Sequence, residues 1–286
     1  MAGYKIIDCR ARPDTAPFIE TLKNPLLQND MRKFGRTPPT KAQPLKECME
    51  FFESEGVSRI VCMGRDMETG TPGCDTILDN AYIAQIAAEE PDRIIGIAGI
   101  NPLKPDAVQN VRHAIKDLGL KGVSIDPAFM DLYADDERIY PVYEECARLG
   151  VPVILTLGPR PFGHGTRMCY CTPLPVDHVA ADFPALRILV SHGGFPWMQE
   201  MVAIAFRNDN VWFETSAYWF MPGVSGMIVE AVNGHLEDKI CFGTAYPFAP
   251  VRETIERFAA LPFKPEALPK LFERNIRRLL GEEQQS

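Results

Sequence analysis

Residues 5–13 read Lys5-Ile6-Ile7-Asp8-Cys9-Arg10-Ala11-Arg12-Pro13, and the interpretation of the whole chain depends on them. The apolar start predicts a short strand that enters a core, and Pro13 ends it because proline has no N–H to donate to a sheet. Strand alternation would place Asp8, Arg10 and Arg12 on one face. Two buried arginines are costly without partners, so they either pair with carboxylates of the protein or bind an anionic ligand.

A short apolar strand followed by a helix recurs along the whole chain. Strands are expected at residues 5–8, 57–64, 93–100, 122–126, 151–156, 187–192, 211–215 and 239–243. Continuous apolar strands that alternate with helices indicate a parallel sheet buried on both faces. Eight such units without a linker predict a single-domain α/β fold, a (β/α)8 TIM barrel over residues 1–286. An open doubly wound sheet is the alternative, but no Gly-x-Gly-x-x-Gly turn follows the first strand.

The segments between the strands are expected to be mostly helical. Helices are predicted at residues 46–55, 76–89, 106–118, 136–149, 176–183, 196–207 and 227–232, and from residues 251, 265 and 275 onward. Residues 14–44 form a polar, proline-rich segment without a predicted helix. The glycine-rich loop at 158–173 is either a lid over a site or a solvated surface loop.

In a barrel of this kind the chemistry lies at the carboxyl ends of the strands. Those ends carry arginines, one carboxylate, one histidine and several small polar or aromatic side chains. We predict that substrate contacts come from Arg10, Arg12, Arg65, Thr156 and Tyr246.

His192 and Asp126 are the predicted catalytic residues. Imidazole titrates near neutral pH and suits general acid–base catalysis, whereas the structural alternative is a hydrogen-bonded histidine that caps the barrel core. Asp126 could assist His192 or act as a second base. Its alternatives are an Asx-type cap before Pro127 and an ion pair with Arg10 or Arg12.

The three arginines are suited to a planar anion because a guanidinium fork matches a carboxylate or a phosphate. The alternative is an internal ion-pair network with Asp8, Asp66 and Asp126, and both can hold together. We therefore expect a small anionic, carboxylated substrate.

Composition narrows the possible partners. The net charge of −8 and the absence of long basic runs argue against nucleic acid. No apolar run reaches the roughly 18 residues of a membrane span, and the N-terminus lacks a signal segment, so a cytoplasmic protein is expected. Cys169-Tyr170-Cys171 is the one close cysteine pair, which is a weak metal signal. Barrels of this kind often form homo-oligomers, and the sequence leaves the oligomeric state open.

The order of these segments resembles the amidohydrolase superfamily, in particular the amidohydrolase-related branch that includes decarboxylases, hydratases and lactonases. Five segments carry the resemblance: Ile7-Asp8, Asp182-Phe183-Pro184, Val190-Ser191-His192-Gly193-Gly194, Phe242-Gly243-Thr244-Ala245-Tyr246-Pro247 and Asn275-Ile276-Arg277-Arg278-Leu279-Leu280-Gly281. The resemblance implies a barrel with a pocket at its carboxyl end.

The metal site of the family does not carry over to this chain. Members that bind zinc or manganese have His-x-His after the first strand, where this chain has Arg10 and Arg12. Thr156 and Ala245 stand at two further ligand positions, and only His192 remains. Metal-free lactone-processing members exist, so we predict no metal or other cofactor and a lactone-directed, metal-independent hydrolase. A carboxy-lyase or hydratase, or an inactive protein that binds an anionic metabolite, is the alternative.

Overall fold

The computed structural model describes residues 3–68, 75–159 and 167–282. Eight parallel strands form its central sheet, in the order in which they occur in the chain. They are β1 (Ile7–Asp8), β2 (Arg59–Met63), β5 (Ile94–Gly99), β6 (Val123–Ile125), β7 (Val153–Thr156), β8 (Ile188–Ser191), β9 (Val211–Glu214) and β10 (Ile240–Cys241). The expected single-domain (β/α)8 fold is therefore confirmed.

The first and last strands meet and curl the sheet. The Cys9 N–H donates to the Phe242 carbonyl at 3.0 Å, and Ala11 forms a parallel bridge with Tyr246. Side chains alternate along the strands as the period of two requires. One set packs inside the barrel (Ile7, Val61, Ile95, Ile154, Leu189 and Trp212), and the other set contributes to the larger apolar core that includes the surrounding helices.

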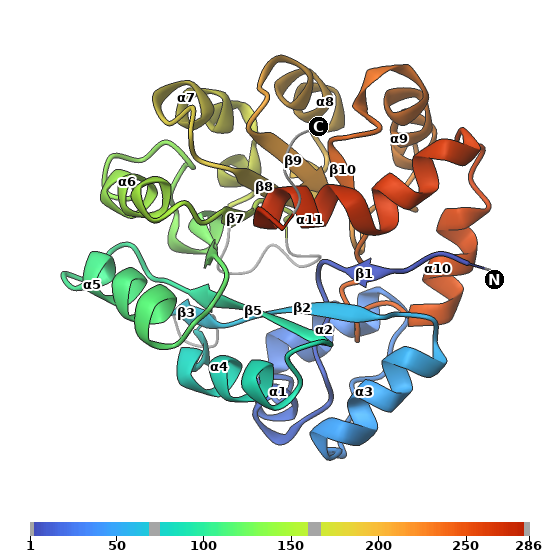
Figure 1. Cartoon of the computed structure of the whole chain (residues 1–286), viewed down its shortest axis with the longest axis horizontal. Coiled ribbons are helices and arrows are strands. Elements are labelled where there is room, and N and C mark those ends of the chain that lie inside the picture. Colours follow the sequence, from blue (N-terminus) through green and yellow to red (C-terminus); the bar gives the residue numbers. More distant parts are fainter. Residues whose placement is uncertain (1–2, 69–74, 160–166, 283–286) are drawn as a thin grey trace.

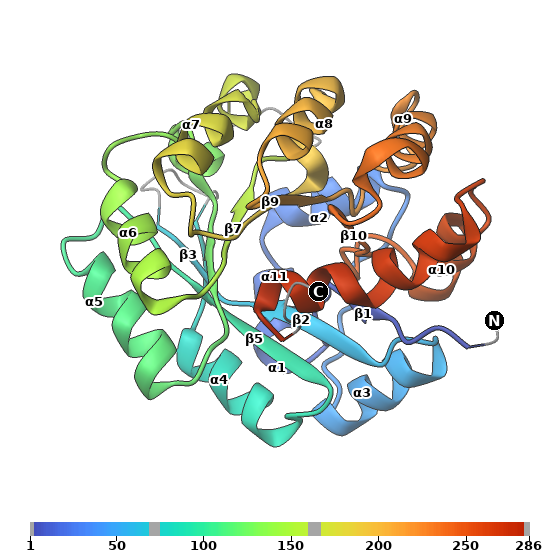
Figure 2. The same ribbon diagram turned by 45° about the horizontal axis from the view of Figure 1, so that its top comes forward.

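Helices surround the sheet, and α11 crosses one end of it (Figures 1 and 2). The helices are α1 (Ala16–Thr21), α2 (Pro25–Lys33), α3 (Leu45–Ser54), α4 (Asn80–Glu89), α5 (Ala107–Arg112), α6 (Tyr140–Leu149), α7 (Leu174–Asp182), α8 (Met198–Arg207), α9 (Val224–Ala231), α10 (Val251–Ala259) and α11 (Asn275–Leu280). Ile276 and Leu279 of α11 pack onto the side chains inside the barrel. This helix therefore closes the end of the barrel that lies away from the strand carboxyl ends.

Shorter 3₁₀ and π segments complete the chain. They are η1 (His113–Asp117), η2 (Pro127–Met130), η3 (Met168–Cys171), η4 (His192–Gly194), η5 (Val232–Leu236), η6 (Pro265–Ala267) and η7 (Lys270–Arg274). Residues 160–166 of the loop that we considered as a lid lie outside the described residues.

Two predictions between the strands were wrong. Residues 14–44 contain α1 and α2, because Pro17 and Pro25 occupy first-turn positions that suit helix starts, and Asn24 accepts from the Leu26 N–H at 2.9 Å. Residues 76–78 form strand β4 (Thr76–Leu78), antiparallel to β3 (Arg65–Met67), rather than the start of a helix. Asp79 caps the helix that follows by accepting from Ala81 N–H at 2.8 Å.

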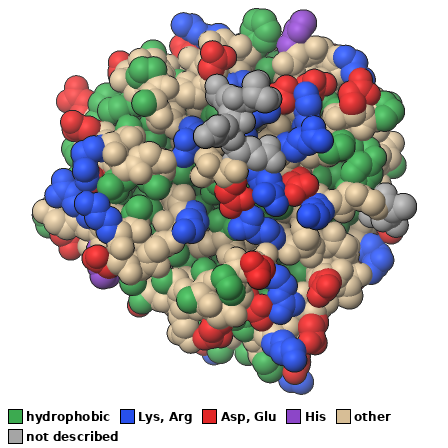
Figure 3. Space-filling model, viewed as in Figure 1, with side chains coloured by type: hydrophobic (Ala, Val, Ile, Leu, Met, Phe, Trp, Pro, Cys, Tyr) green, Lys and Arg blue, Asp and Glu red, His purple; other side chains and the backbone are tan. Residues whose placement is uncertain are grey.

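The distribution of charged side chains on the surface (Figure 3) agrees with the acidic net charge of the chain. On the face seen in Figure 3, basic and acidic side chains are interspersed and do not form a basic stripe. None of the helices in the described part of the chain is long and apolar enough to cross a membrane.

Candidate functional site

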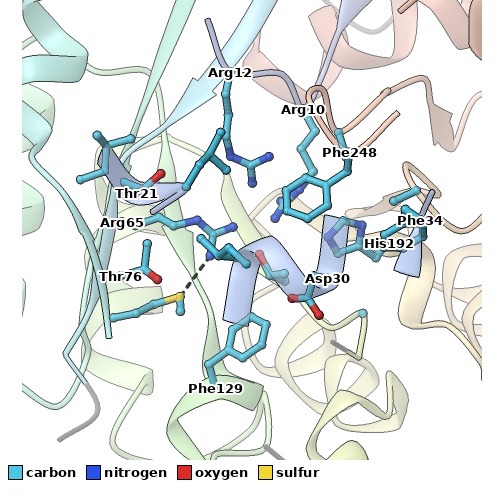
Figure 4. Close-up of a pocket in the computed structure, with 18 of the residues that line it drawn as sticks. Arg10, Arg12, Thr21, Asp30, Phe34, Arg65, Thr76, Phe129, His192 and Phe248 are labelled. Atoms are coloured by element: carbon cyan, nitrogen blue, oxygen red, sulfur yellow. Dashed lines mark hydrogen bonds between the residues drawn. The ribbon is translucent and has the colours of Figure 1, made fainter. Parts of the chain in front are cut away.

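A cavity lies at the carboxyl ends of the strands. Its volume is about 90 Å³, several times the roughly 10–15 Å³ that one water molecule needs. Figure 4 shows Arg10, Arg12 and Arg65 pointing into it, with His192 nearby and Phe129 across from the arginines. The remaining wall is largely apolar and includes Phe18, Leu22, Leu27 and Phe34 from the α1–α2 segment, together with Phe248.

Arg10 is anchored to the barrel interior. Its Nη1 donates to Ser191 Oγ at 2.7 Å and lies 3.7 Å from Met63 Sδ, while its buried Nε has no hydrogen-bond partner among the described residues. Burial and the neighbouring Arg65 lower the pKa of Arg10, and Glu214 opposes this effect. Nη1 of Arg10 is therefore held by Ser191, whereas its Nε still lacks an acceptor among the described residues.

Arg65 has an acidic partner. Its Nη1 donates to Asp126 Oδ1 at 3.0 Å and lies 3.0 Å from Met67 Sδ. Asp126 does not line the cavity and is only 4% exposed. The ion pair that we considered for this carboxylate therefore forms, although with Arg65 rather than with Arg10 or Arg12.

Arg12 is the least satisfied of the three arginines. Its buried Nη1 finds no hydrogen-bond partner within residues 3–68, 75–159 and 167–282, and its guanidinium carbon lies 5.7 Å from the Phe248 ring centroid. Burial, Arg65 and Arg10 together hold the pKa of Arg12 well below its ordinary value. A bound anion would relieve both the missing hydrogen bond and the repulsion between cations.

His192 presents one ring nitrogen to the cavity and uses the other for support. Nδ1 lies 2.8 Å from the Ser216 carbonyl oxygen, which can only accept, so Nδ1 carries the proton. Burial and the cation of Arg10 hold the pKa of the imidazole well below its ordinary value. The ring is therefore neutral at pH 7, with an unprotonated Nε2 that can accept a proton.

The backbone at His192 adopts a conformation that is rare for a residue other than glycine. His192 has φ +65° and is followed by Gly193 and Gly194, also at positive φ. A Cβ added at Gly158, two residues after β7 ends, would lie 2.4 Å from His192 Cβ, so only glycine leaves room for the His192 side chain there. Strain of this kind persists where surrounding contacts over-determine it.

Two buried carboxylates lie beneath the cavity. Glu214 accepts from the Ser191 hydroxyl and from the backbone N–H groups of His192 and Ser216, at 3.1 and 2.5 Å for the two amides. Asp8 accepts from the N–H groups of Arg10 and Thr244, at 3.0 Å each, and from Thr244 Oγ1 at 2.5 Å. Burial raises the pKa of Asp8 to about 7.

Of the other two predicted substrate contacts, Thr156 and Tyr246, one lines the cavity and the other does not. Thr156 lines the cavity, with a buried hydroxyl that has no partner among the described residues. Tyr246 does not line it, because its hydroxyl donates to Asp14 at 2.7 Å and its ring packs against Phe51 and Phe52.

Sequence reasoning missed Glu214 and Ser191. Both are the last residues of apolar strands, two positions after an interior side chain, so the period of two would have placed them inside the barrel. It also missed the wall from α1 and α2, because no helix was predicted there.

The donor set at the cavity does not fit a divalent metal. Such an ion needs three or four nitrogen, oxygen or sulfur donors with free lone pairs. Among the titratable side chains that line the cavity, Asp30 and His192 offer such donors, whereas the three protonated guanidinium groups do not. In the part of the chain that the structure describes, no three His, Cys, Asp or Glu side chains are grouped to hold a metal.

The fold and the cavity define a (β/α)8-barrel protein with its site at the strand carboxyl ends. Residues 7–281 match the family described as Amidohydrolase, and the chain belongs to that family. Across 97% of this chain and 99% of the other, it resembles the solved structure of an uncharacterised TIM-barrel protein from Bordetella bronchiseptica, with a TM-score of 0.85 and 31% identity.

Two curated relatives match parts of the chain. A 2-amino-3-carboxymuconate-6-semialdehyde decarboxylase from Dictyostelium discoideum is 35% identical over 78 residues, which cover 27% of this chain and 21% of that protein. A 2-keto-4-carboxy-3-hexenedioate hydratase from Sphingobium sp. is 25% identical over 181 residues, 51% of this chain and 52% of that one. The matches thus span about a fifth and about half of the relatives' lengths.

Proposed function

We propose that the protein is a lyase that adds water to the double bond of a small unsaturated carboxylic acid, or removes water in the reverse direction. The observation that carries the proposal is the placement of His192, with Nδ1 held 2.8 Å from the Ser216 carbonyl oxygen, beside three guanidinium groups in one cavity. The names of the two curated relatives, a decarboxylase and a hydratase, favour a lyase over the hydrolase that we first expected.

The arginine side of the cavity suits a carboxylate. Arg12 has an unpartnered buried Nη1, Arg10 an unpartnered Nε and Thr156 an unpartnered hydroxyl, all within the described residues. A buried polar group without a partner costs about 1–3 kcal/mol. A substrate carboxylate with an oxygen-bearing neighbour would satisfy these groups, and the aromatic walls would cover a planar, conjugated body.

The imidazole side suits proton transfer. In hydration, the water oxygen bonds to the β carbon while Nε2 of His192 takes the water proton. The electron pair of the double bond moves toward the carboxylate or carbonyl and makes an enolate oxygen beside the arginines. The proton on His192 then returns to the α carbon. Guanidinium groups aimed at the developing negative charge take the place of a metal as the electrophile.

Hydrolysis of a lactone is the second candidate. The same Nε2 could activate water for attack on the ring carbonyl, whose oxyanion would meet Arg10 or Arg12. Decarboxylation fits the arginines less well, because a guanidinium that stabilises the reacting carboxylate in the ground state does not lower the barrier to its loss as carbon dioxide.

Product analysis in oxygen-18 water separates these reactions. The panel contains open-chain unsaturated acids, lactones and aromatic carboxylic acids. We expect an open-chain acid to gain one labelled water. Labelled ring opening confined to lactones would establish hydrolysis instead, and carbon dioxide release without label would establish decarboxylation. Either result contradicts the proposal.

The proposal also requires that no divalent metal take part. Prolonged dialysis against a chelator is expected to leave the rate unchanged within twofold. Lost activity that zinc or manganese restores would contradict the assignment of the electrophile to the arginines.

A further inference from the structure

Glu214 is a fully buried acid in an otherwise apolar strand. It ends β9 two residues after Trp212, whose side chain packs inside the barrel. It lies beneath the cavity and does not line it, so it cannot touch a substrate there. A fully buried carboxylate is expensive unless donors surround it, and the identity of those donors indicates what this one does.

Two of the donors are backbone amides, one of His192 itself and one of Ser216. Oε1 accepts from the His192 N–H at 3.1 Å, and Oε2 accepts from the Ser216 N–H at 2.5 Å. The Ser216 carbonyl oxygen is the acceptor for His192 Nδ1. One carboxylate therefore links the backbone that carries the imidazole with the residue that holds its proton.

The third donor belongs to a separate branch. Ser191 Oγ donates to Oε1 of Glu214 and accepts from Nη1 of Arg10 at 2.7 Å. This branch orients an anion-binding arginine and does not touch the imidazole. The two branches can be cut separately, because the Ser191 hydroxyl is a side chain whereas the other two donors are backbone groups.

We propose that Glu214 is a positioning residue that sets the tautomer of His192, keeping the proton on Nδ1 and leaving Nε2 as the base. The inference rests on the proposed function for its catalytic meaning, although not for its test. The φ of +65° at His192 fits this role, since a strained residue must be held by its surroundings.

Glutamine cannot replace this carboxylate. The two backbone donors lie on different oxygens, and a glutamine offers one oxygen and one NH2 group. In either orientation of the amide, one backbone N–H faces another donor. The segment that carries His192 or Ser216 must then shift, and the Nδ1–H to carbonyl bond weakens.

Long-range ¹H–¹⁵N NMR spectra of the intact ¹⁵N-labelled protein test the inference, because they distinguish protonated from unprotonated ring nitrogens. The chain has 5 histidines, and the signals that disappear in His192→Asn identify His192. In the wild type we expect a protonated Nδ1 and an unprotonated Nε2 at pH 7. In Glu214→Gln we expect the Nδ1 signal to move toward the unprotonated position and the Nε2 signal toward the protonated one.

Ser191→Ala is the matched control. It removes the hydroxyl branch and leaves both amide bonds, so it is expected to show the wild-type nitrogen signals. A wild-type pattern in folded Glu214→Gln overturns the inference, as does a shift in Ser191→Ala as large as that in Glu214→Gln.

If Glu214→Gln does not fold, Glu214→Asp takes its place. Its carboxylate is one methylene shorter, and a smaller shift in the same direction supports the inference, whereas unchanged signals overturn it. These spectra need no substrate. If no acid or lactone were turned over, the proposed function would fail while the tautomer result would still stand.

Discussion

The two sides of the cavity are built in opposite ways. The β1–β2 side brings Arg10, Arg12 and Arg65 together, and two of them keep buried nitrogens without hydrogen-bond partners among the described residues. On the β8–β9 side, His192 Nδ1 and its backbone N–H both have acceptors. The first side therefore keeps donors without partners, whereas the donors on the second side are already satisfied.

This difference separates binding from chemistry. Unpartnered cations gain most from a ligand that carries negative charge, so the β1–β2 side is expected to determine affinity. A neutral imidazole held in one tautomer has little to reorganise when it takes a proton, so the β8–β9 side is expected to determine rate. The following substitutions act on one side at a time.

Substitution of the imidazole is expected to have the largest effect. Asparagine can form hydrogen bonds but cannot accept a proton at neutral pH, so His192→Asn should lower kcat by roughly 10²–10⁴-fold. Steady-state kinetics on the substrate found in the product screen measure this. His113→Asn, on the exposed surface beside Asp117, is the matched control and should keep wild-type kcat. Normal turnover by His192→Asn would make the histidine structural.

The carboxyl of Asp8 should make stability depend on pH. Its ordinary pKa is 3.8, and burial raises it to about 7. Between these pH values the folded protein binds more protons than the unfolded chain, so this group's contribution falls as pH rises toward 7 and is lost above it. The shift in the pKa of Asp8 corresponds to at most about 4 kcal/mol of unfolding free energy.

Asp8→Asn removes this titration and keeps the hydrogen bonds, because the Thr244 hydroxyl can accept from the new NH2 group. Its unfolding free energy relative to wild type should therefore increase from about pH 4 to about pH 8. Urea unfolding at each pH measures the difference. A difference independent of pH would mean that Asp8 is ionised throughout the range.

The two neighbouring arginines should differ in stability. Arg10→Met removes a charge-assisted bond to Ser191 and should lower the unfolding free energy by roughly 1–3 kcal/mol. Arg12→Met removes a buried cation with no ion pair in the described chain, and should leave the unfolding free energy unchanged or raise it. Arg138→Met, on the surface beside Asp136, is the control. Equal losses in Arg10→Met and Arg12→Met would show an internal network on this side.

The sequence predicted the barrel because strand and helix patterns are local and repeat. It also placed Arg10, Arg12, Arg65, Thr156 and His192 near strand ends, and all five line the cavity. Whether they bind and catalyse as expected stays a prediction.

What the sequence could not supply was pairing across the barrel. The ion-pair network that we considered included Asp126, but the sequence could not tell that its partner is Arg65 rather than Arg10 or Arg12, and Tyr246 turns toward α3. Both depend on side-chain directions after a strand has ended, where the period of two no longer holds. Glu214 was missed for a different reason: the strand was expected to run to residue 215, whereas β9 ends at the inward-facing Glu214.

Calorimetric binding of the same substrate to His192→Asn and Arg12→Met tests the division of the cavity most directly. We expect His192→Asn to bind within about threefold of wild type, and Arg12→Met to bind roughly ten- to a hundred-fold more weakly, since a charge-assisted bond contributes about 1.5–3 kcal/mol. Tight binding by Arg12→Met together with lost binding by His192→Asn would contradict the account.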